Sequence, residues 1–209
     1  MNAQKPRGRE EIVFFLLAPV LILLSSSLVQ ATDVWNITED TDIYSGTYGL
    51  IDIYDSPPDN TTVNFYGDLA DYIGTHDSSI LNMYDGHADV RALDTSIINI
   101  SGGTLSLAET WQYGEINISG SSEVEAIGAR DFGTVDLYSG IVNRIAVLAS
   151  AEINIYGGQL TQWLNVIDTG QVNVYGHDLD KTNYGGTINR DCPEWRFLKI
   201  LTKRVSLCR

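Results

Sequence analysis

A six-residue pattern of alternating apolar and polar positions recurs along this chain. One copy reads INIYGG at Ile153–Gly158, with apolar residues at its first and third positions and polar residues at its second and fourth. A period of two predicts a short β-strand with one buried face, because successive side chains of a strand point to opposite sides. The glycine that follows predicts a sharp corner with a positive φ angle. Each copy is therefore expected to form one strand that ends in a tight turn.

Seven copies of this pattern follow one another at nearly constant spacing, with start-to-start intervals of 18, 17, 18, 19, 18 and 19 residues. They are VNFYGD at Val63, LNMYDG at Leu81, INISGG at Ile98, INISGS at Ile116, VDLYSG at Val135, INIYGG at Ile153 and VNVYGH at Val172. Weaker copies begin at Thr41 and Ile51 with irregular spacing. A period this constant indicates a repeat architecture.

A second apolar position follows the first by seven residues in most copies. These residues are Ala70, Ala88, Leu105, Val142, Leu160 and Leu179, and the position slips by one residue to Val124 in the copy at Ile116. Glycine and β-branched residues interrupt every window, and no apolar stripe with helical spacing survives. The repeats are therefore not helical.

Identical residues at the same position (offset) in successive repeats distinguish stacked rungs from antiparallel hairpins. In stacked rungs each residue lies about 4.8 Å from its own copy, whereas neighbouring strands of a meander need no such identity. We therefore predict an all-β fold, a parallel β-solenoid with rungs of about 18 residues, and the usual crossover preference makes it right-handed. Regular rungs are expected over residues 63–189, with Ile98, Ile116, Val135 and Ile153 aligned inside.

The polar positions of the pattern form two predicted columns. The second position holds Asn64, Asn82, Asn99, Asn117, Asp136, Asn154 and Asn173. Stacked amides of this kind hydrogen-bond from rung to rung, so we interpret the column as structural, and contact with a sugar or a cation is the alternative.

The fourth position predicts an outward-facing aromatic column in two patches. Its members are Tyr66, Tyr84, Ser101, Ser119, Tyr138, Tyr156 and Tyr175. Exposed rings in a row suit stacking on sugar planes, with hydroxyl groups as polar contacts. Mutual bracing of neighbouring rungs explains the same residues.

Acidic residues gather after the predicted corners. They are Asp68, Asp71, Asp85 and Asp89, with a further pair at Asp178 and Asp180. Ca²⁺ takes roughly six to eight oxygen ligands, so it is the one cofactor that this pattern suggests. The nonapeptide repeat of Ca²⁺-binding β-helices is absent, and solvated acidic corners are the alternative interpretation.

The sequence contains no recognisable catalytic motif. Arg91, Arg130 and Arg144 fall at different offsets within their rungs, so we expect that they do not line up in one groove. A nucleophile elbow, a Cys/His pair and an HExxH motif are all missing. No catalytic residue is therefore assigned.

Charge divides the chain into an acidic body and a basic tail. Residues 32–189 carry 23 acidic against four basic residues, a net charge of −19, whereas residues 190–209 have a net charge of +4. An acidic body repels nucleic acid and anionic lipid, which excludes both as its partners.

The first 31 residues have the anatomy of a secretory signal peptide. A basic start precedes the apolar run Ile12–Leu24, and Val29–Ala31 has the small residues of a cleavage site. The run is shorter than the roughly 20 residues of a spanning helix, so an uncleaved membrane anchor is the weaker alternative. We predict a mature chain without a transmembrane segment, located outside the cell, at its surface or in the periplasm.

The basic tail lacks the repeat and the negative charge of the body. The residues DCPE at 191–194 resemble a helix start, after which Trp195, Leu198 and either Leu201 or Val205 share one face. One interpretation is a cap over the last rung, and the other is an unselected terminus left by a truncated or shifted reading frame.

The repeats INISGG, VDLYSG and INIYGG behind a signal peptide resemble those of bacterial secreted right-handed β-helix proteins, over residues 41–189. These include adhesin-type and autotransporter-type passengers and, more distantly, the pectate-lyase-like superfamily. The resemblance implies fold and secretion but no activity, because that superfamily mixes lyases, hydrolases and non-enzymes. The sequence favours a secreted, non-enzymatic, adhesin-like scaffold that contacts polysaccharide, and the alternative is a polysaccharide lyase or hydrolase.

Overall fold

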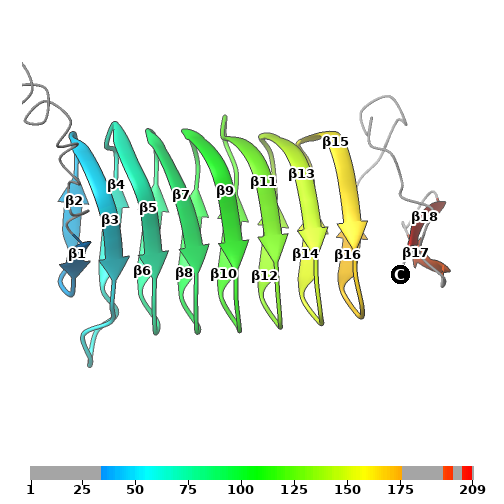
Figure 1. Cartoon of the computed structure of the whole chain (residues 1–209), viewed down its shortest axis with the longest axis horizontal. Coiled ribbons are helices and arrows are strands. Elements are labelled where there is room, and N and C mark those ends of the chain that lie inside the picture. The colour runs from blue at the N-terminus through cyan, green and yellow to red at the C-terminus, as the bar shows by residue number, and fades with distance from the viewer. Residues whose placement is uncertain (1–33, 176–194, 200–203, 209) are drawn as a thin grey trace, which may run out of the picture. The chain divides into compact units, whose positions relative to one another are not determined.

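The computed structural model of the chain describes residues 34–175, 195–199 and 204–208 (Figure 1). The described residues form eighteen strands and no helix. The shorter strands of the repeats are β2 (Thr41–Ile43), β4 (Thr62–Phe65), β6 (Ile80–Met83), β8 (Ile97–Ile100), β10 (Glu115–Ile118), β12 (Thr134–Leu137), β14 (Glu152–Ile155) and β16 (Gln171–Val174). The partner strands are β1 (Val34–Ile37), β3 (Thr47–Ile53), β5 (Leu69–Thr75), β7 (His87–Ala92), β9 (Thr104–Thr110), β11 (Glu123–Ala129), β13 (Ile141–Val147) and β15 (Gln159–Val166).

The chain alternates between two parallel eight-stranded sheets. The even-numbered strands β2 to β16 form one sheet, here called the short-strand sheet, and β1 to β15 form the long-strand sheet. Each turn of the chain adds one strand to each sheet, which gives a β-solenoid of about eight turns with rungs about 18 residues apart. In Figure 1 the rungs advance from left to right while the nearer strands run downward and the farther ones upward, so the coil is right-handed. The predicted fold is confirmed.

The predicted interior column is present in the short-strand sheet. Ile116 pairs with Ile98 on one side and with Val135 on the other, and Val135 pairs with Ile153. All four side chains are fully buried. Parallel pairing in register places each apolar residue over its copy in the next rung, and this continuity keeps water out of the stack.

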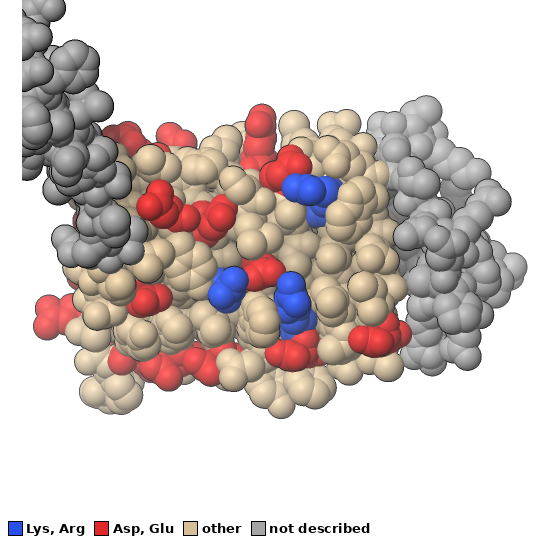
Figure 2. All heavy atoms as spheres, viewed as in Figure 1, with Lys and Arg blue, Asp and Glu red and all other residues tan. Residues whose placement is uncertain are grey.

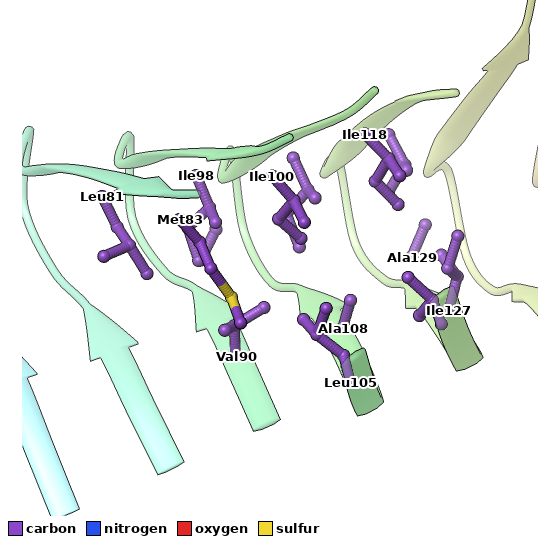
Figure 3. Close-up of a cluster of buried hydrophobic side chains, with 14 of the residues drawn as sticks. Leu81, Met83, Val90, Ile98, Ile100, Leu105, Ala108, Ile118, Ile127 and Ala129 are labelled. Carbon is purple, nitrogen blue, oxygen red and sulfur yellow. The ribbon is translucent and has the colours of Figure 1, made fainter. Parts of the chain in front are cut away.

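The core lies between the two sheets. Side chains such as Leu81 and Ile98 point from the short strands toward Val90, Leu105 and Ile127 of the long strands (Figure 3). The second apolar position of the repeat, which includes Leu105, is buried wherever the structure describes it. Both sheets thus contribute one apolar face, as the alternating pattern requires.

The two corners of each rung use different residues. The corner after each short strand holds glycines, and positive φ angles occur at Gly86, Gly120 and Gly140, as expected. In the rung of Ile98 the positive φ angle belongs to Gly103, and Gly102 is needed because a Cβ there would lie 2.2 Å from the carbonyl oxygen of Tyr84. The corners after β5, β7, β9, β11, β13 and β15 place other residues in the left-handed region, namely Asp77, Asp94, Gln112, Asp131, Ala149 and Asp168. Aspartate and asparagine tolerate this conformation best after glycine.

The tail does not form the helix that its sequence start suggested. Trp195–Lys199 (β17) and Arg204–Cys208 (β18) pair as an antiparallel two-stranded sheet. Two five-residue runs joined by four residues suit a β-hairpin, and this pairing outweighs the capping signal before them. The segment predicted as a signal peptide, Leu179, Asp178, Asp180 and the start of the tail at 190–194 lie outside the described residues. Among the residues that are described, no helix is long and apolar enough to cross a membrane.

Candidate functional site

The asparagine column of the short-strand sheet is a hydrogen-bonded ladder. The side-chain amide of Asn64 donates to Asp42 at 2.8 Å, and those of Asn82, Asn99 and Asn117 donate to the preceding rung at 2.9, 2.9 and 3.2 Å. The ladder resumes after Asp136, which accepts from Asn154 at 2.9 Å. Asp136 has no N–H to donate to Asn117, so the ladder breaks at this step. The column therefore stabilises the stack, as the structural interpretation predicted.

The predicted tyrosine column forms two stacks of rings. Tyr66 and Tyr84 stack at a centroid distance of 4.7 Å, and Tyr138, Tyr156 and Tyr175 stack at 5.0 and 4.7 Å. Tyr44, from the weaker copy at Thr41, extends the first stack at 5.2 Å and was missed because the spacing of that copy is irregular. Exposed fractions of these tyrosines run from 38% to 68%, so the column faces solvent over its whole length.

Stacking determines which parts of the rings a ligand can reach. The interplanar angles within the stacks are only 7° to 11°, so neighbouring rings lie face to face. A ring inside a stack therefore exposes its edge and its hydroxyl group but neither face. Ser101 and Ser119 separate the two stacks, and we call these two positions the serine gap. Among the described residues, the faces without a stacked tyrosine are those at the ends of the two stacks, and the faces of Tyr84 and Tyr138 are the two that border the serine gap.

The surroundings of four tyrosines in the column favour the protonated form of their hydroxyl groups. Partial loss of hydration raises the pKa of Tyr66 and of Tyr156 above its ordinary value. The carboxylate of Asp136 raises the pKa of Tyr138, whose hydroxyl donates to it at 3.3 Å, and Asp42 acts likewise on Tyr44 at 3.2 Å. Neutral hydroxyl groups can both donate to and accept from a ligand, as sugar hydroxyls require.

The four aspartates proposed for Ca²⁺ lie in different settings. Asp68, Asp71 and Asp85 are exposed, and Asp85 accepts a hydrogen bond from the backbone N–H of Gly86 at 2.8 Å. Asp89 is half-buried and accepts from the backbone N–H of Leu107 at 2.9 Å. Within the part of the chain that the structure describes, no three His, Cys, Asp or Glu side chains are grouped to hold a metal ion.

The outer face of the long-strand sheet carries a cluster that the sequence analysis missed. The Nε and Nη2 atoms of Arg91 donate to Oε2 of Glu109 at 3.1 and 2.8 Å, and Nη2 of Arg130 donates to Oε1 at 3.3 Å. The Glu109 side chain is only 9% exposed, beneath the two guanidinium groups. The expectation that the arginines stay apart is therefore wrong for Arg91 and Arg130, whereas Arg144 forms a separate ion pair with Glu125.

Aromatic side chains hold the two guanidinium groups in place. Arg91 lies between the rings of Tyr72 and Trp111, at 5.5 and 5.6 Å from their centroids, and Arg130 lies 4.9 Å from the centroid of Trp111. The indole N–H of Trp111 also donates to Glu109 at 3.4 Å. Cation–π contacts and a shared carboxylate together restrict both arginines to one arrangement. We call Arg91, Glu109, Trp111 and Arg130 the arginine–tryptophan cluster.

Irregular rung lengths explain why the offsets of the arginines within their repeats did not predict this cluster. The pairing of β7 shifts in register against both of its neighbours, β5 and β9. Arg91 consequently pairs with Glu109, although the two residues lie at different distances from the start of their repeats. The interval of 17 residues before the copy at Ile98 was the available signal, because a missing residue in one rung requires a bulge.

Asp52 and Glu109 on this face are not spaced as a glycosidase pair. Asp52 lies on β3 and accepts from His76 at 3.3 Å, and Glu109 lies on β9, three strands away in the sheet. Three strand spacings amount to about 14 Å, whereas the two carboxyl groups of glycosidases lie roughly 5 to 9.5 Å apart. Glu109 is also held by two arginines, which opposes a role as an acid or a base.

The function of these surfaces has to be inferred from their own geometry. No protein-family model matches the chain, and neither a curated protein nor a solved structure shows significant similarity to it. The structure shows a parallel β-solenoid, whereas the bacterial and secreted character of the proteins that its repeats resemble stays a prediction from the sequence.

Proposed function

We propose that the protein is a secreted, non-enzymatic β-solenoid that acts as a surface or extracellular scaffold and contacts polysaccharide through its tyrosine column. The observation that carries this proposal is the alignment of six solvent-exposed tyrosines in two stacks on one corner of the solenoid. Aromatic rings in an exposed row are costly in water unless a partner covers them, and sugar planes pack well against such rings.

The serine gap is the part of the column best suited to sugar stacking. Tyr84 and Tyr138 are three rungs apart, so their uncovered faces look toward each other across about 14 Å. Carbon atoms in contact lie about 4 Å apart, which leaves room for one pyranose ring against each face. Ser101 and Ser119 add hydroxyl groups between the two faces. The edges and hydroxyls of the remaining tyrosines then extend the contact along the axis of the stack.

The regularity of the rungs supports a scaffold rather than an enzyme. Enzymes build clefts from long loops, but the intervals between the seven regular copies vary by only two residues. The longest connection between strands in residues 34–175 is the segment of eight residues between β3 and β4. It lies at the corner after a long strand, opposite the corner that carries the serine gap, and it precedes β4, two rungs before the rung of Ser101.

The test replaces Tyr138, Tyr156 and Tyr175 together with serine, the residue that two other rungs already carry at this offset. The full chain and the triple variant are passed over columns of immobilised neutral and acidic polysaccharides, and their fold is checked by circular dichroism. We expect the variant to stay folded and to lose its retention on the neutral polysaccharide. A folded variant that is fully retained would leave the column purely structural and would contradict the proposal.

The same protein also tests the enzymatic alternative. It is incubated with the polysaccharide that retains it, with and without Ca²⁺, and the supernatant is assayed for unsaturated and reducing sugars. A scaffold releases neither product. Calcium-dependent release of unsaturated sugar would establish a lyase instead.

A further inference from the structure

The arginine–tryptophan cluster concentrates the basic residues of an acidic body. Arg91, Arg130 and Arg144 are the only Lys or Arg residues between positions 34 and 175, and two of the three converge on Glu109. Two guanidinium groups against one carboxylate leave an excess of one positive charge. On the face shown in Figure 2, basic groups lie beside acidic ones near the middle of a surface whose other charges are acidic.

Both guanidinium groups keep hydrogen-bond donors that the cluster does not use. Arg91 engages Glu109 through Nε and Nη2, and Arg130 engages it through Nη2 alone. Neither Nη1 atom has an acceptor among the described residues. The side chains of Arg91 and Arg130 are 34% and 39% exposed, so these donors can reach a ligand in solvent.

The geometry fixes the guanidinium groups before any ligand arrives. Arg91 contacts the rings of Tyr72 and Trp111, and Arg130 contacts the ring of Trp111. Each group is thus ordered without the entropy loss that a free arginine side chain pays on binding. A planar fork of N–H donors with a net positive charge matches a carboxylate, which accepts two parallel hydrogen bonds.

We propose that the arginine–tryptophan cluster is a second binding site, which takes the carboxylate of an acidic saccharide. The carboxylate receives hydrogen bonds from the free donors of Arg91 and Arg130. Two guanidinium groups already contact the Trp111 ring, so we assign the recognition to the acidic group of the sugar rather than to stacking on this ring. This inference rests on the proposed function only in assigning the carboxylate to a saccharide.

Two matched arginine variants test the site. The full chain is titrated calorimetrically with a uronic acid oligosaccharide and with the same oligosaccharide after reduction of its carboxyl groups to alcohols. Arg130→Gln is expected to weaken binding of the acidic form about tenfold and to leave the reduced form unaffected. Arg144→Gln removes the same charge from the separate pair with Glu125, and it should change affinity by less than about twofold. Equal losses in both variants would show a general charge effect and overturn the site.

The variant Glu109→Gln distinguishes a binding role of the cluster from a purely structural one. It leaves the shape of the side chain almost unchanged but removes the negative charge that competes with a ligand for the arginines. We expect tighter binding of the acidic oligosaccharide, since the excess positive charge doubles. Unchanged or weaker binding by folded Glu109→Gln protein would assign the cluster to structure alone. Sodium acetate is the probe for a free carboxylate, and acetate that competes as well as the oligosaccharide would overturn the assignment to a saccharide.

The result is distinguishable from a failure of the proposed function. Retention on neutral polysaccharide through the tyrosine column with no preference for the acidic form refutes only the cluster. Binding of the acidic oligosaccharide that depends on Arg130 but not on the tyrosines supports the cluster and refutes the column.

Discussion

The two outer faces of the solenoid are built on different rules. The short-strand sheet pairs in register over all eight strands and repeats the same side chains, asparagine on asparagine and tyrosine on tyrosine. The pairing of the long-strand sheet shifts in register at three places. The shifts lie just before Tyr72 in the pair β5–β7, before Val90 in the pair β7–β9 and before Arg144 in the pair β13–β15. Its side chains form contacts between unlike groups, such as Arg91 with Glu109 and Trp111.

This difference separates what repetition can explain from what it cannot. A column of identical residues gains stability from each neighbour, so stacking alone accounts for the asparagine ladder. A contact between unlike residues occurs at one place in the stack and is absent from the other rungs. The stability of the repeat therefore does not depend on it. Bulges that re-aim side chains are common beside binding sites. The irregular face is therefore as strong a candidate for ligand binding as the exposed tyrosines.

Ile118→Asp should produce the largest effect, because it tests the buried side of the regular sheet. Ile118 is fully buried between Ile100 and Leu137, and a carboxylate there has no partner. We expect the free energy of unfolding to fall by about 3–5 kcal/mol. Urea denaturation measures it, with Ser119→Asp as the outward-facing control. Equal stability of Ile118→Asp and the parent protein would mean that the inward and outward faces are reversed.

The asparagine ladder predicts a pair of opposite, smaller effects. Asn99→Asp removes the donor to Asn82, so we expect a loss of about 1 kcal/mol. Asp136→Asn supplies the missing donor to Asn117 and should add stability of similar size. Urea denaturation midpoints of the two variants check the signs. Two losses, or two gains, would show that the ladder does not control stability.

Alkaline pH tests the protonated state of the tyrosine column. The pKa values of Tyr66, Tyr138 and Tyr156 are raised in the folded chain, so the neutral phenols favour folding. This contribution is complete below the unfolded pKa near 10 and is lost as the pH rises through the folded values. Tyrosinate absorbance should therefore titrate at higher pH in the native than in the urea-unfolded chain. Coincident titrations would remove the electrostatic account of the column.

Ser101→Tyr should give the smallest effect. The new ring stacks on Tyr84 and extends the first stack by one rung, a contact worth about 0.2–1 kcal/mol. Thermal unfolding should shift slightly upward. A clear loss of stability would mean that the backbone at Ser101 cannot accept a ring, although six other rungs carry tyrosine at the same offset.

The regular face could be predicted from the sequence, and the irregular face could not. Ile98 and Ile116 recur at one offset, and that identity alone fixed the strand, its buried side and its pairing. Tyr138 and Tyr156 were placed in one column by the same reasoning. Arg91 pairs with Glu109 because β7 contains register shifts, and equal offsets counted along the chain do not place the two residues side by side.

The tail shows a second limit of local signals. The residues before Trp195 resemble a helix start, yet the next five residues form β17. Capping residues contribute about 1 kcal/mol, and the pairing of β17 with β18 forms a run of backbone hydrogen bonds that exceeds it. Tertiary pairing therefore decided the structure where local preference was weak.

The most direct test of the account is the affinity of the double variant Ser101→Tyr and Ser119→Tyr for the polysaccharide that retains the parent protein. Filling the serine gap joins the two stacks and covers the uncovered faces of Tyr84 and Tyr138 while it adds aromatic surface. If sugars stack on those faces, the folded double variant binds at least about tenfold more weakly than the parent protein. The control variant Ser78→Tyr adds a ring at the opposite corner, and it should bind as tightly as the parent protein. Equal or tighter binding by the filled column would contradict the account.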